Sequence, residues 1–147
     1  MDNKRTVGFE LRSLNNLIRR DIEKNHPAEL DCTKGVHGLA IGYFYHNRDK
    51  DIFQKDFEEH FSIRRSTATQ ILKLMEKRGY ITRQSVDYDA RLKKIVLTNK
   101  AMEINKIIRK DIDNREQRLT QGLSDNEIES FLNIIEKMKA NLEAKND

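Results

Sequence analysis

The sequence predicts a mainly α-helical protein that carries one two-stranded β-hairpin. Apolar residues make up 37% of the 147 positions, and most of them recur at three- and four-residue spacings, the period of an amphipathic helix. With one proline and six glycines, the chain has few positions that would interrupt a helix. One stretch, residues 80–98, is rich in β-branched residues instead, and it supplies the hairpin.

The first part of the chain predicts three helices. The first covers residues 7–24 and places its apolar side chains on one stripe, at Leu11, Leu14, Ile18 and Ile22. Residues 25–35, which include Pro27, break this pattern. A short apolar helix then covers residues 36–46, and a further helix covers residues 53–61.

Residues 64–78 predict a fourth helix with two chemically different faces. Its apolar positions follow the spacing i, i+3, i+4, i+7, at Ala68, Ile71, Leu72 and Met75. By the same period the opposite face carries short polar and cationic side chains, including Ser66, Thr69, Gln70 and Lys73. Gly79 follows the helix and is expected to cap its C-terminus.

The hairpin is expected to have strands at residues 80–86 and 93–98, joined by a turn at residues 87–91. After Thr98 a long helix runs to about Gly122. Ser124 and Glu127 then form a capping box that begins the last helix. The apolar stripe of that helix consists of Ile128, Phe131, Leu132, Ile135, Met138 and Leu142.

The positive charge of the chain is concentrated in residues 61–100. They hold ten Lys and Arg against three Asp and Glu, a balance of +7, whereas residues 1–60 sum to −1 and residues 101–147 to −2. A localised cationic surface favours a phosphate backbone, because each neutralised phosphate releases condensed counterions. A membrane surface would also require an apolar face beside the cations, but this helix uses its apolar face for the core.

A helix, a short turn, a second helix and a basic hairpin together form the layout of a winged helix-turn-helix. An α-helix fits the major groove of B-DNA, where short polar side chains reach base edges and flanking cations hold phosphates. Each such residue taken alone is an ordinary solvated side chain, but their combination with the hairpin favours DNA binding. The expected DNA-binding residues are Arg64, Arg65, Ser66, Thr67, Thr69, Gln70, Lys73, Arg83, Arg91, Lys93 and Lys94.

Asp89 stands out as an acidic residue at the tip of this basic hairpin. Its carboxylate can hold the Arg91 guanidinium extended through charge-assisted hydrogen bonds, so that the arginine enters a minor groove already arranged. Alternatively, Asp89 supplies only the chemistry of a type I turn and leaves Arg91 exposed.

These segments resemble the MarR family of transcriptional regulators. The resemblance rests on residues 53–63, on Thr67, and on the run Met75-Glu76-Lys77-Arg78-Gly79-Tyr80-Ile81. It is strongest in the hairpin, where Asp89-Ala90-Arg91 followed by Ile95-Val96-Leu97-Thr98 is similar to the family's Asp-x-Arg and Leu-Thr wing signature. The similarity extends over essentially the whole chain.

The resemblance implies a single domain over residues 1–147, with dimerisation helices at about 1–30 and 101–147 and a winged helix-turn-helix at about 33–100. It implies a homodimer that binds double-stranded DNA at an inverted repeat, with Arg91 in the minor groove and Asp89 supporting it. We expect a repressor that is released by a small anionic or phenolic effector. The expected dimer interface consists of Leu11, Leu14, Ile18, Ile108, Ile112, Phe131, Ile135 and Leu142.

Other classes of function are disfavoured. No phosphate-binding glycine loop, HExxH motif or nucleophile elbow is present, so we expect neither an enzyme nor a cofactor. The four histidines all precede residue 61, which disfavours a metal site on the long helix, and the lone Cys32 lies outside the first helix. Without a long apolar segment we expect a cytoplasmic protein. A protein-interaction scaffold with a basic hairpin remains the alternative to a DNA-binding regulator.

Overall fold

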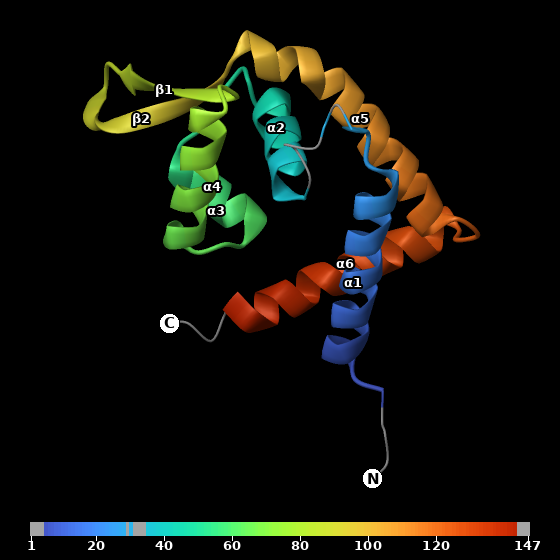
Figure 1. Cartoon of the computed structure of the whole chain (residues 1–147). Helices are drawn as coiled ribbons and strands as arrows, with labels where there is room; N and C mark the ends of the chain where they lie inside the picture. Colours follow the sequence, from blue (N-terminus) through green and yellow to red (C-terminus); the bar gives the residue numbers. More distant parts are fainter. Residues whose placement is uncertain (1–4, 29, 31–34, 144–147) are drawn as a thin grey trace. The chain divides into compact units, whose positions relative to one another are not determined.

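The computed structural model describes residues 5–28, 30 and 35–143 of the chain. Figure 1 follows the elements from the N-terminus to the C-terminus. Two compact units are distinguished, residues 1–112 and residues 113–147, and each is considered by itself. In chain order the elements are α1 (Val7–Asn25), α2 (Val36–His46), α3 (Gln54–Phe61), α4 (Arg65–Lys77), β1 (Ile81–Val86), β2 (Asp89–Leu97), α5 (Asn99–Thr120) and α6 (Asp125–Glu143).

The predicted fold class is confirmed, and the helix ends lie within two residues of the positions expected from the sequence. The hydrophobic core of the first unit joins α2, α3, α4, the hairpin and the first part of α5. Phe57 of α3 is fully buried, with its ring 5.5 Å from that of Phe44 and 4.8 Å from that of Phe61. On α4 the buried side chains are Ala68, Leu72 and Met75, three of the four positions predicted to face the core.

A glycine ends α4 as the sequence predicts. Arg78 is the C-cap residue of α4, and Gly79 follows it with φ +79°, in the left-handed region. The backbone N–H of Tyr80 donates to Met75 O at 2.9 Å, and that of Gly79 donates to Glu76 O at 3.0 Å. These two bonds form a Schellman motif, which turns the chain directly into the hairpin.

The hairpin differs from the prediction in its turn. We expected a five-residue turn at residues 87–91, but β2 begins at Asp89, so only Asp87 and Tyr88 lie between the strands. Val86 pairs with Asp89, and an irregularity between Ser85 and Val86 adjusts the register. Turn-forming residue types therefore overstated the length of the turn, because Asp89 already pairs with Val86 and residues 90–92 lie in the irregularity of β2 rather than in the turn.

The hairpin also pairs with the segment that precedes α3. Ile95 N–H donates to Ile52 O at 2.7 Å, and the Ile52 side chain is buried in the core. Further toward the turn, the Tyr88 hydroxyl donates to Asp51 Oδ2 at 2.9 Å, and Lys94 Nζ lies 3.5 Å from Asp51 Oδ1. The hairpin is thus attached to residues 51–52 both near its turn and near its base.

His26 caps the C-terminal end of α1, and its buried imidazole has two partners. Nδ1 lies 3.0 Å from Asp111 Oδ2 on α5, and Nε2 lies 2.6 Å from Leu30 O. A carbonyl oxygen only accepts, so Nε2 carries a proton and donates to Leu30. This side chain attaches the end of α1 to α5 in the first unit.

The second unit contains the end of α5, a turn and α6. Gly122 occupies the turn with φ +83°, a conformation that suits glycine. The predicted capping box is present, since Ser124 N–H donates to Glu127 Oε2 at 2.8 Å and Glu127 N–H donates to Ser124 Oγ at 3.1 Å. No residue of α6 is buried.

Candidate nucleic-acid interface

The exposed face of α4 carries the polar set that the sequence predicts. Burial of Ala68, Leu72 and Met75 on one face leaves the other face open to solvent. Thr69 is half-buried, and the remaining predicted side chains of this segment are exposed, namely Arg64, Arg65, Ser66, Thr67, Gln70 and Lys73. One helix therefore presents hydroxyl, amide and cationic groups side by side.

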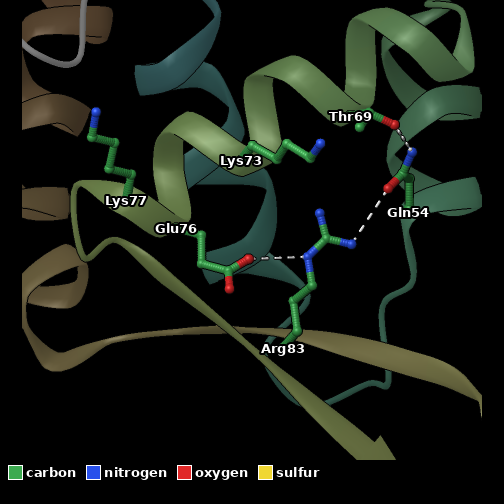
Figure 2. A pocket seen from close by; sticks show the side chains of 6 residues that line it. All are labelled: Gln54, Thr69, Lys73, Glu76, Lys77 and Arg83. Carbon is green, nitrogen blue, oxygen red and sulfur yellow. Dashed lines mark hydrogen bonds and ion pairs between the residues drawn. The ribbon is translucent and has the colours of Figure 1, made fainter.

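A network of side chains links α4 to α3 and β1, as Figure 2 shows. Gln54 Nε2 donates to Thr69 Oγ1 at 2.9 Å, and Gln54 Oε1 accepts from Arg83 Nη1 at 3.5 Å. Arg83 Nε also donates to Glu76 Oε2 at 3.2 Å. Together with two cations of α4, these residues line an open hollow, whose complete lining is Gln54, Thr69, Lys73, Glu76, Lys77 and Arg83.

Because of this network, Arg83 is not a free cation that could bind a phosphate unopposed. Its side chain is 27% exposed and paired with Glu76, so its charge is partly compensated within the protein. Lys73 and Lys77 also line this hollow and are exposed, and Figure 2 draws no hydrogen bond or ion pair from either of them to the other residues shown. Among the described residues that line the hollow, Lys73 and Lys77 are therefore more available than Arg83 to bind a phosphate.

At the wing, Asp89 contacts both the backbone and the side chain of Arg91. Asp89 Oδ1 accepts from the Arg91 backbone N–H at 2.9 Å and from Nε at 3.2 Å, while Oδ2 accepts from Nη2 at 3.2 Å. The guanidinium hydrogen bonds and the backbone N–H lower the pKa of the Asp89 carboxyl. Asp89 therefore contacts both the backbone and the guanidinium of Arg91, and it does so from the start of β2 rather than from within the turn.

The two lysines of β2 have different partners. Lys93 Nζ donates to Ser85 Oγ across the hairpin at 2.6 Å, and its side chain is exposed. Lys94 lies on the other face of the strand, where its ammonium approaches Asp51. Arg91 is far more exposed than Arg83 or Lys94, because 90% of its side chain remains open to solvent, against 27% and 33% of theirs.

Comparison with known proteins agrees with this geometry. The model of the MarR family matches residues 34–92, which run from the start of α2 into β2. The chain is 22% identical over 139 residues to YybA, an HTH-type transcriptional regulator of Bacillus subtilis, and the match covers 95% of this chain and 87% of YybA. The transcription regulator MarR of Oenococcus oeni superposes with a TM-score of 0.79 at 29% identity, covering 92% of this chain and 99% of that one.

Residues 34–92 of this chain belong to the MarR family, and the chain shares the fold of the transcription regulator MarR. MepR of S. aureus, solved as a complex with DNA, has the same fold, with a TM-score of 0.79 at 22% identity over 95% of this chain and 99% of MepR. The MarR-like wing signature of the sequence, Asp89-Ala90-Arg91, lies at the start of β2.

The expected dimer residues fall into two groups. Ile108 is 2% exposed in the core of the first unit and Ile112 packs against that core, so the assignment of Ile108 to an interface is corrected. Its helical spacing suits burial within one protomer equally well. The other expected residues remain partly or largely exposed in a single chain, namely Leu11, Leu14, Ile18, Phe131, Ile135 and Leu142.

Several functional contacts were not predicted. Gln54, Glu76 and Asp51 contact the predicted DNA-binding residues Thr69, Arg83 and Lys94, but each partner lies 7 to 43 positions away in the sequence. Across the described residues there is no group of three or more His, Cys, Asp or Glu arranged to hold a metal ion. Nor does any described helix have the length and apolar character to cross a membrane. Cys32 lies outside the described residues.

Proposed function

We propose that this MarR-family protein acts as a homodimer that binds an inverted-repeat DNA operator and represses transcription. The observation that carries the proposal is the joint exposure of the polar face of α4 and of Arg91 on the adjoining hairpin. The +7 balance of residues 61–100 lies in the same segment. In this proposal α4 enters the major groove and the wing reaches the neighbouring minor groove.

In the proposed assembly, residues of about 1–30 and 101–147 supply the dimer contacts and residues of about 33–100 supply one winged domain per protomer. The exposed apolar side chains of α1 and α6 support this division. A small anionic or phenolic effector that releases the protein from DNA belongs to the same proposal, and it rests on the family resemblance.

Footprinting on a selected operator should reveal two half-sites related by a two-fold axis, with centres about 10 base pairs apart. This spacing follows because the two identical helices of a symmetric dimer meet the same face of the duplex one turn apart. The observed affinity should fall with salt, by about 0.9 in the log–log slope for each neutralised phosphate. Protection of a single unrepeated site would contradict the dimer, and binding without salt dependence or no binding at all would favour the scaffold alternative.

Replacing Arg91 by alanine should weaken operator binding by about 1–3 kcal/mol if its guanidinium makes an ordered groove contact. Asp89→Ala should also weaken binding, although it removes a negative charge near phosphate, because Arg91 loses its two carboxylate contacts. Asp89→Asn should weaken binding as well, because its amide oxygen can still accept from the Arg91 backbone N–H and Nε, but its NH₂ group cannot accept from Nη2 and the negative charge is lost.

The double variant Asp89→Ala/Arg91→Ala should bind about as weakly as Arg91→Ala alone, because Asp89 then has no guanidinium to hold. Binding titrations of the four proteins at one salt concentration measure this cycle. Losses that simply add would show that the two residues act independently, and the orienting role of Asp89 would have to be abandoned.

A further inference from the structure

Gln54 is the first residue of α3 and lies outside the helix proposed to enter the major groove, yet its side chain contacts that helix. Figure 2 shows its amide between Thr69 on one side and Arg83 on the other. The amide nitrogen is 2.9 Å from Thr69 Oγ1 and 3.5 Å from the backbone oxygen of Arg65, and the amide oxygen is 3.5 Å from Arg83 Nη1.

The chemistry of these neighbours fixes which way the amide points. A backbone carbonyl only accepts hydrogen bonds and a guanidinium only donates them. If the amide were turned over, its oxygen would face the Arg65 carbonyl and its NH₂ group would face the Arg83 guanidinium, so both contacts would become repulsive. The NH₂ group therefore faces Thr69, and Gln54 is the donor in that hydrogen bond.

This orientation determines what Thr69 can offer to a ligand. Because its oxygen accepts from Gln54, its hydroxyl proton points elsewhere. A threonine in a helix often donates to the carbonyl four residues earlier, which here belongs to Arg65. Within the described residues the Thr69 hydroxyl makes no such bond, and its proton remains available at the open hollow beside α4.

We propose that Gln54 is a positioning residue that makes Thr69 a hydrogen-bond donor toward DNA. Thr69 then favours an acceptor, which is either a base-edge atom such as guanine O6 or N7 or thymine O4, or a phosphate oxygen. It disfavours the amino groups of cytosine and adenine at the same position. This inference rests on the proposed DNA-binding function and adds a determinant of specificity outside α4.

Gln54→Glu tests the inference because a carboxylate only accepts. Thr69 must then donate to residue 54, which turns its lone pairs toward the DNA. Operators are selected from a random duplex library with the full-length wild type and with Gln54→Glu, and affinities are measured on the wild-type operator. Lys55→Gln is the matched control, since it lowers the net charge by one at the neighbouring exposed residue without contacting Thr69.

On the wild-type operator, Gln54→Glu should bind about tenfold or more weakly than Lys55→Gln, in line with the usual cost of one mismatched contact. If the acceptor is a base, one position in each half-site should also change its selected base. If it is a phosphate oxygen, the selected sequence should stay the same and only the affinity should fall. In a Thr69→Val background, Gln54→Glu should lose this additional effect in either case.

The inference is overturned if Gln54→Glu and Lys55→Gln agree in both affinity and selected sequence, or if the additional effect of Gln54→Glu persists without the Thr69 hydroxyl. Failure of the proposed function looks different, since the wild-type protein would then select no operator at all. A Thr69→Ser variant, which retains the hydroxyl, should behave like the wild type in its response to Gln54→Glu.

Discussion

The double substitution Phe131→Glu/Leu142→Glu is expected to convert the proposed dimer into monomers. Both side chains lie on one stripe of α6, and 48% of Phe131 and 74% of Leu142 are exposed in a single chain. Covering a large apolar side chain contributes about 1.5–3 kcal/mol, whereas burying an unpaired carboxylate costs several times more. The substitutions should therefore oppose association strongly while one chain still folds.

Sedimentation should show a fall from twice the chain mass to 17.4 kDa. Operator affinity should drop about 10²–10⁴-fold, because a monomer occupies only one half-site and loses the advantage of two linked contacts. Asn133→Glu/Ala140→Glu is the matched control, since it adds the same two charges on the opposite side of α6 and should leave a dimer. A folded Phe131→Glu/Leu142→Glu dimer would contradict the proposed interface.

Phe57→Ala is expected to lower the free energy of unfolding by about 3–5 kcal/mol. Phe57 has no exposed surface and packs against the rings of Phe44 and Phe61, so truncation leaves a cavity where α2 and α3 meet. Domains of this kind unfold with about 5–15 kcal/mol in total, so this single loss removes a large share of the stability.

Urea unfolding at a fixed protein concentration measures this loss, because the stability of a dimer depends on concentration. Phe9→Ala provides the comparison. Phe9 is 66% exposed and lies off the Leu11, Leu14 and Ile18 stripe of α1, so its truncation should change stability by about 0.5 kcal/mol or less. Equal effects of the two substitutions would show that Phe57 is not a core residue in solution.

Local patterns were sufficient to predict the helices of this chain. The period of α4, the glycine after it and the capping box before α6 each act within a few residues, and the structure contains all three. The hairpin turn was predicted less well. Asp87, Tyr88 and Asp89 all suit a turn locally, but pairing of Val86 with Asp89 decides where the turn ends.

Periodicity could not reveal what covers an apolar stripe. Ile108 has the spacing of an interface residue, yet the fold of one protomer already buries it. Likewise, the contact between His26 and Asp111 spans 85 positions, and that between Gln54 and Arg83 spans 29. Such contacts depend on how helices and strands pack, which residue types and spacings alone do not determine.

Burial along the hairpin separates the part that holds the fold from the part proposed to meet DNA. Ile81, Ile95 and Leu97 at the base are at most 7% exposed, whereas Tyr88 at the turn is 66% exposed. Apart from Val86, which is 9% exposed, substitutions near the turn therefore remove little packing and should alter stability only slightly. If the wing contacts DNA as proposed, single substitutions at its exposed tip change the preferred operator without disturbing the core.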